Sequence, residues 1–148
     1  MAHDDVLEHV EEIVAEYDLL LIDTNLFQAG RRRVLRVLLD KVGRVSLDEC
    51  ATVSRAIANA IETLDLIGGA YTLEVSSPGI GRQLSTENDW IRCVGRKLEI
   101  KTEFEEFVST LMNYEEGILT FEDGRVTDPG SVLTAREAIQ EEGSIGGF

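Results

Sequence analysis

The sequence predicts an α+β protein built from two small domains, residues 1–84 and residues 85–148. Up to residue 76, two segments with apolar residues at helical spacing alternate with three segments that have the two-residue period of strands. After residue 95 only the two-residue period remains, in short runs separated by turn residues. A chain of 148 residues is long enough for two small hydrophobic cores.

The first predicted element is a helix that begins at Asp4 or Asp5, because either carboxylate can cap the first turn. Its apolar stripe consists of Val6, Val10, Ile13, Val14 and Tyr17. Its other side is acidic, with Glu8, Glu11, Glu12 and Glu16. With no base or metal ligand nearby, these carboxylates indicate a solvated helix face and not an acid–base pair.

A β-hairpin is predicted next, because two apolar runs at residues 19–28 and 33–41 flank Ala29-Gly30. Alternation in the second run predicts two faces. One face carries Leu35, Val37 and Leu39, and the other carries Arg36, Leu38 and Asp40.

The second helix begins with a clear signal, since Ser46 and Glu49 have the spacing of a capping box. Its predicted buried stripe is Cys50, Val53, Ile57, Ile61 and Leu64. Gly68-Gly69 is expected to end the helix, and a strand over residues 71–76 follows. That strand is expected to end in a defined turn, because Pro78 holds Ser77 extended and Gly79 permits a positive φ.

The resulting order of helix, strand, strand, helix, strand predicts two helices covering one face of a three-stranded sheet. This order occurs in KH-like modules, which clamp RNA with a GxxG loop. Residues 1–84 contain no such loop, so the order alone does not establish RNA binding.

The second domain begins with a predicted helical connector over residues 85–94, ended by Gly95. Strands are predicted over residues 96–102, 107–114 and 118–122, with tight turns between them. Short strands at this spacing predict a small β-barrel of the SH3 or Sm type. Residues 135–142 have helical propensity, and residues 143–148 are expected to be loose.

The formal net charge is −14, so the chain as a whole should repel phosphate backbones and attract basic partners. An equally open interpretation is that the acidity only supports solubility. The exception is a local cluster in residues 31–44, where Arg31, Arg32, Arg33, Arg36, Lys41 and Arg44 accompany one acid, Asp40. This cluster is either a contact for phosphate or acidic protein, or a solvated hairpin tip.

Several function classes find no support in the sequence. No apolar run is long enough to span a membrane and the first residues are acidic, so a cytoplasmic protein is expected. Cys50 and Cys93 lack metal-site spacing and are interpreted as small buried side chains. No catalytic, cofactor-binding or metal-binding motif is present, so we expect no enzyme activity, no cofactor and no metal.

Two segments, VSLDECATVSRAI at residues 45–57 and LEVSSPG at residues 73–79, together resemble the RimP family of bacterial ribosome maturation factors. The resemblance implies a non-enzymatic factor that associates with the free small (30S) ribosomal subunit and assists its late assembly. It also implies help in incorporating a basic small-subunit ribosomal protein near the decoding centre. The family usually continues as Leu-Asp-Arg-Pro-Leu, whereas this chain has IGRQL at residues 80–84, and Gly81 should make that joint more flexible.

Two sets of candidate contact residues follow. The strand-end surface comprises Glu74, Ser77, Pro78, Gly79 and Arg82, and the arginine patch comprises Arg31, Arg32, Arg33 and Arg36. The second set is the candidate contact for ribosomal RNA. Three alternatives remain open: residues 77–79 are only a turn that orients the domains, the chain is an RNA-binding module, or it is an acidic adaptor unrelated to ribosomes.

Overall fold

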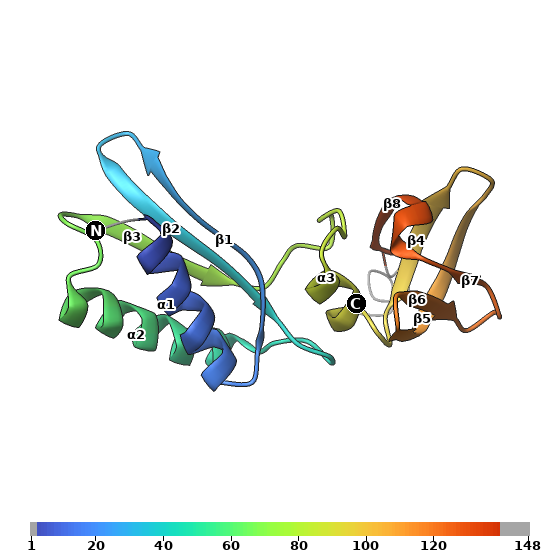
Figure 1. The fold of residues 1–148 in the computed structure, drawn as a ribbon, viewed down its shortest axis with the longest axis horizontal. Helices are drawn as coiled ribbons and strands as arrows, with labels where there is room; N and C mark the ends of the chain where they lie inside the picture. The colour runs from blue at the N-terminus through green and yellow to red at the C-terminus, as the bar shows by residue number, and fades with distance from the viewer. Residues whose placement is uncertain (1–2, 140–148) are drawn as a thin grey trace, which may run out of the picture. The chain divides into compact units, whose positions relative to one another are not determined.

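Two compact units, Met1–Pro78 and Gly79–Phe148, make up the computed structural model, which describes residues 3–139. The first unit has the predicted order of elements (Figure 1). These are α1 (His3–Glu16), β1 (Leu20–Ala29), β2 (Arg32–Asp40), α2 (Leu47–Leu64) and β3 (Tyr71–Ser76). No helix within residues 3–139 is both long and apolar enough to cross a membrane.

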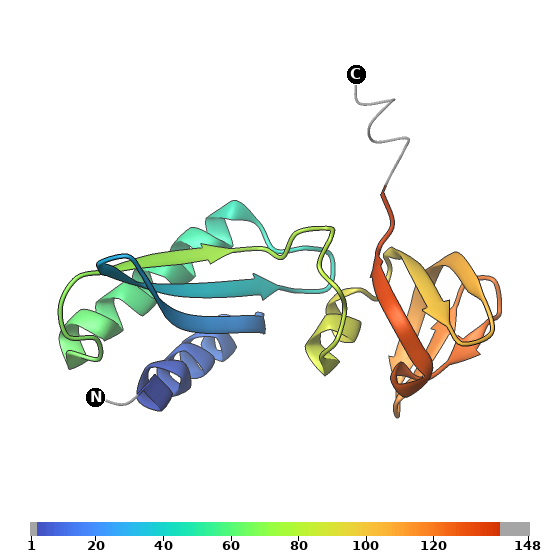
Figure 2. The ribbon, with the colours of Figure 1, turned by 90° about the horizontal axis from the view of Figure 1, so that it is seen from above.

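The sheet of the first unit has the order β1-β2-β3. β1 and β2 form the predicted antiparallel hairpin, while β3 pairs parallel to β2. A parallel neighbour needs a crossover connection, and α2 supplies it. Figures 1 and 2 show both helices against the same face of this sheet.

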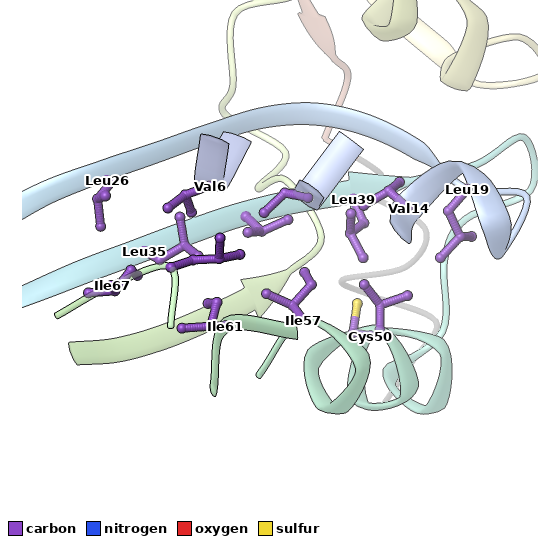
Figure 3. Close-up of a cluster of buried hydrophobic side chains, with 14 residues drawn as sticks. Val6, Val14, Leu19, Leu26, Leu35, Leu39, Cys50, Ile57, Ile61 and Ile67 are labelled. Carbon is purple, nitrogen blue, oxygen red and sulfur yellow. The ribbon is translucent and has the colours of Figure 1, made fainter. Parts of the chain in front are cut away.

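The core of the first unit lies between that sheet face and the two helices (Figure 3). The predicted alternation in β2 is confirmed, because Leu35, Val37 and Leu39 are fully buried there. The helices contribute most of the stripes that spacing predicted, namely Val6, Val10 and Val14 from α1 and Cys50, Val53, Ile57 and Ile61 from α2. Tyr17 was predicted wrongly, because it lies just after the end of α1 and its side chain is exposed. The predicted capping box is also present, with the Glu49 amide donating to Ser46 Oγ over 3.0 Å.

The end of α2 was predicted wrongly. The helix ends at Leu64, before Gly68-Gly69, and the Leu64 side chain is half exposed. Asp65 takes the left-handed cap conformation with φ 51°, and its amide donates to the carbonyl of Ile61. This cap turns the chain so that Leu66 and Ile67 enter the core instead.

The second unit is an α+β segment dominated by one antiparallel sheet of order β7-β6-β5-β4-β8. Its elements are α3 (Glu87–Arg92), β4 (Lys97–Thr102), β5 (Glu106–Glu115), β6 (Ile118–Phe121), β7 (Val126–Thr127), a 3-10 turn η1 (Pro129–Ser131) and β8 (Val132–Glu137). Within residues 79–139 the hydrogen-bonded ladder ends at β7 and β8 and does not close into a barrel.

The helix predicted over residues 135–142 is wrong where the structure describes it. Ala135 and Glu137 belong to β8 and pair with Ile100 and Leu98 of β4. Ala135 is fully buried, so tertiary pairing overrides a local preference for helix. Residues 140–148, including the remainder of that predicted helix, lie outside the described residues.

The division between the units lies at Pro78 and Gly79 rather than after Leu84. Leu84 is buried in the core of the second unit, and its amide donates to the carbonyl of Ala135 over 2.8 Å. Residues 79–84 therefore belong structurally to the unit that follows them.

Candidate functional site

The strand-end surface begins where β3 leaves its sheet. Ser76 is the last paired residue, opposite Leu38 of β2. Ser77 and Gly79 are exposed, and Pro78 is partly exposed. The turn was predicted at residues 77–79 but lies at residues 79–82, where the Arg82 amide donates to the Gly79 carbonyl over 3.1 Å. The positive φ expected at Gly79 is not found, since the turn passes through residues 80 and 81 instead.

The Arg82 side chain does not point outward as a free contact. Its guanidinium donates to both carboxylate oxygens of Asp89, from Nε to Oδ1 and from Nη2 to Oδ2, each over 3.0 Å. Asp89 is fully buried and also accepts from the amides of Ser85 and Thr86 and from Nε of Arg92. Arg82 therefore ties the segment after the turn to the beginning of α3.

The electrostatics of Asp89 fit a structural ion cluster. Burial by itself would raise the pKa of Asp89. The hydrogen bonds from Arg82, from the backbone of Ser85 and Thr86, and from Arg92 outweigh it and lower the pKa from 3.8 to about 2. The group stays ionised at neutral pH, so it does not serve as a general acid. A sequence signal for this cluster existed but was missed, because Thr86 and Asp89 have capping-box spacing and form that box.

The arginine patch divides into two pairs. Arg32 donates from Nε to Thr72 Oγ1 over 2.9 Å and from Nη2 to the Tyr71 carbonyl over 2.8 Å. Arg36 donates from Nε to Glu74 Oε1 over 2.8 Å and lies 5.0 Å from the centre of the Phe27 ring. Both side chains thus bind neighbouring strands on the sheet face opposite the helices.

The side chains of Arg31 and Arg33 make no hydrogen bond or ion pair with residues 3–139, although the backbone of Arg33 is paired within the sheet. Arg31 lies in the two-residue hairpin turn after Gly30, which has φ 63°, and its side chain is exposed. These two guanidinium groups are therefore the members of the patch with charge available for an external anion.

Glu74 and Arg36 came from different sets in the sequence analysis, yet the structure brings them into contact. The parallel register places Arg36 opposite Glu74 and Val34 opposite Thr72. We call the group Phe27, Arg32, Arg36, Thr72 and Glu74 the open-face cluster. The pairing of β3 with β2 creates it, and no local pattern in the sequence marks that register.

Among the described residues, the two cysteines and the His, Asp and Glu side chains do not gather into a metal site. Cys50 and Cys93 are free and buried, one in each unit, as predicted. Burial raises the pKa of the Cys93 thiol to about 11 and also raises that of Cys50. Within the described part of the chain, no group of three or more His, Cys, Asp or Glu residues has the arrangement of a metal site.

A comparison with models of protein families identifies the first unit. Residues 9–81 match the model of the RimP N-terminal domain. The chain carries a RimP N-terminal domain. The segments 45–57 and 73–79 lie inside this match, so the resemblance noted in the sequence is confirmed as a family relationship. The open-face cluster and the arginine patch are parts of the RimP domain, whereas Arg82 and Asp89 belong to the unit that follows.

Proposed function

We propose that the protein is a non-enzymatic ribosome maturation factor that binds the free small ribosomal subunit and assists its late assembly. The observation that carries this proposal is the RimP N-terminal domain over residues 9–81. The partner we propose is a basic small-subunit ribosomal protein, which the factor helps to incorporate near the decoding centre. The net charge of −14 supports a partner of that kind.

The proposed contacts follow from exposure. Ser77, Pro78 and Gly79 form an accessible segment at the end of β3 and are proposed to contact the subunit. Arg82 is proposed to act by positioning, because its side chain is bound to Asp89. Glu74 is held by Arg36 and is proposed to contribute through the open-face cluster.

An RNA contact is proposed for the hairpin tip of the RimP domain. The guanidinium groups of Arg31 and Arg33 have no partner within residues 3–139, and a phosphate would supply one. An alternative is that RNA binding through this tip is the protein's main activity, without any role in assembly. Affinity would then fall steeply with salt and would disappear when both arginines are changed to alanine. A third possibility, an acidic adaptor, predicts no enrichment with small subunits.

For the second unit we propose an open SH3/Sm-like barrel, in which β7 and β8 approach each other without a hydrogen-bonded ladder between them. In its sheet, the last strand β8 returns to pair with the first strand β4, and β5, β6 and β7 follow on the other side. A four-stranded meander of β4 to β7, with β8 added beside β4, approaches closure when such a sheet is strongly curved. Contacts between backbone protons of β7 and β8, measured by NMR, test the proposal.

The first experiment is sedimentation of the purified protein with free small subunits through a density gradient at near-physiological salt. We expect co-migration with the small subunit and not with the complete ribosome. A protein that remains at the top of the gradient while the subunits stay intact would contradict the proposed function.

A further inference from the structure

A hollow of about 470 Å³ opens on the second unit, where the β4–β5 turn faces β7 and the beginning of β8. Three exposed apolar side chains line it: Phe104, Val126 and Leu133. Their exposures are 90%, 61% and 59%. Scattered apolar residues on a surface need no explanation, but a group gathered around one hollow is typical of a binding site.

The turn that carries Phe104 is held by its own hydrogen bonds. Thr102 Oγ1 accepts from the amides of Phe104 and Glu105 over 3.3 and 3.2 Å. The Thr102 amide donates to the Glu105 carbonyl over 2.9 Å. The exposed phenyl ring is therefore presented by an ordered turn, which reduces the conformational entropy that a partner must remove on binding.

The hollow also has a fixed wall beneath this turn. The Phe107 ring packs edge-on against Phe121, with ring centres 5.1 Å apart. The Arg125 guanidinium lies 4.5 Å from the centre of the Phe107 ring. Arg125 is held there by Glu105 at 3.1 Å and by Asp123.

The charges around the hollow favour a cation. Glu103 and Glu105 line it, and Glu103 makes no hydrogen bond or ion pair with the described residues. Arg125 is the cation in the lining, and it already has two carboxylate partners. A nucleic acid would meet net negative charge here, whereas a lysine or arginine would meet the unpaired Glu103.

The backbone around the hollow suits an extended chain. Its lining includes residues of both β7 and β8, the two strands that end the ladder of the sheet. An edge strand presents backbone amides and carbonyls that an added strand can pair with. A peptide segment can therefore place an apolar side chain in the hollow while its own backbone bonds to one of these edges.

We infer that this hollow binds a short extended segment of a partner protein in which an apolar side chain is flanked by lysines or arginines. The inference rests on the proposed function, because the basic ribosomal protein proposed there has this chemistry. It adds a site in the second unit, on residues that neither candidate set contains.

The test uses the full chain and a synthetic lysine-rich peptide with two leucines at its centre. Backbone amide signals are followed by NMR during titration, and the dissociation constant is obtained from the shifts. We expect the largest shifts at residues 102–105, 126–127 and 131–133. Replacing the leucines by serines or the lysines by glutamates should each weaken binding at least about tenfold, because each removes one of the two recognised features.

Variants of the protein locate the site. Phe104→Ser and Leu133→Ser should each weaken the leucine peptide about tenfold. Ile118→Ser is the matched control, since Ile118 is an exposed apolar residue of the same unit that does not line the hollow. All three side chains are exposed, so thermal unfolding should change little.

Three results would overturn the inference. One is no peptide binding, or shifts that lie outside the hollow. Another is equal affinity of the Phe104→Ser variant and the unchanged protein. The third is a dimer that Phe104→Ser converts to a monomer, since the hollow would then be a contact between two copies. Failure of co-sedimentation with small subunits, with peptide binding intact, would reject the proposed function and leave the hollow as a peptide site.

Discussion

At the scale of single residues, one buried carboxylate organises the beginning of the second unit. Asp89 accepts hydrogen bonds from Arg82, Ser85, Thr86 and Arg92, and so fixes the chain on both sides of the start of α3. Arg92 is almost fully buried as well. Removing one partner from such a cluster leaves another charge in a poorly solvated place, which costs more than the pair itself contributes.

We therefore predict that Asp89→Asn lowers the free energy of unfolding of the second unit by about 3 kcal/mol. Urea unfolding followed by the fluorescence of Trp90 measures this, because Trp90 is the single tryptophan and is buried in that unit. Asp123→Asn removes an exposed carboxylate that also pairs with an arginine, and should change stability little. Equal effects of the two substitutions would contradict this role of Asp89.

The same cluster predicts a pH dependence. The pKa of Asp89 is about 2 in the folded protein and has its ordinary value of 3.8 without these partners. The unfolded chain therefore binds the proton more tightly, and the stabilisation present above pH 3.8 is lost as the pH falls toward 2. The difference corresponds to about 2 kcal/mol. In Asp89→Asn this part of the acid destabilisation should be absent from urea titrations at successive pH values.

Ser77 separates the two interpretations of the strand-end surface. Its side chain is exposed, so Ser77→Tyr should leave thermal unfolding nearly unchanged. If the segment contacts the small subunit, the added bulk should weaken co-sedimentation roughly tenfold. Ala51→Tyr, on an exposed position of α2, is the matched control. A Ser77→Tyr protein that binds like the control would indicate that residues 77–79 are only a turn.

At the scale of elements, the pairing of β2 with β3 decides what the arginine patch can do. In this pairing the side chains of Arg32 and Arg36 bind β3, whereas those of Arg31 and Arg33 have no partner among the described residues. Alternation along β2 predicted which residues are buried, and spacing of three residues predicted the Ser46–Glu49 capping box. Both are local signals. The contact of Arg36 with Glu74 could not be predicted from the sequence, because it depends on the register of two strands and joins residues 38 positions apart.

This division predicts different outcomes for the two pairs of arginines. Changing Arg31 and Arg33 to alanine should lower the slope of log affinity against log salt for ribosomal RNA by about 1 for each phosphate that the tip no longer binds. Stability should not change. Arg36→Ala removes an exposed ion pair and a cation–π contact, and should lower the free energy of unfolding by less than about 1 kcal/mol. A salt slope that responds only to Arg36→Ala would contradict the assignment.

At the scale of the whole molecule, each unit has a core of its own residues. The sequence was sufficient to predict two units, the order of elements in the first and the strands β4, β5 and β6 of the second, because periodicity and turn residues are local. It placed the boundary after Leu84, since nothing in residues 79–84 shows that Leu84 packs beneath β8 or that Arg82 binds Asp89. The strand β8 was missed for a similar reason, because its partner β4 lies far earlier in the chain.

Separate cores predict separate unfolding transitions. Ile57→Ala in the first core should lower the stability of the RimP domain by about 3 kcal/mol and shift the transition seen by circular dichroism. The fluorescence transition of Trp90 should stay in place. A common shift of both signals would show instead that the units unfold together.

The distribution of thiols has a practical consequence. Cys50 and Cys93 are free, and burial both shields them and keeps them protonated. A thiol reagent therefore reacts with each only when the surrounding unit opens, so the two modification rates report two local opening equilibria in one unlabelled protein. Mass spectrometry of the modified peptides separates the two rates. A bound ribosomal subunit or peptide that slows only one of them identifies the unit to which it binds.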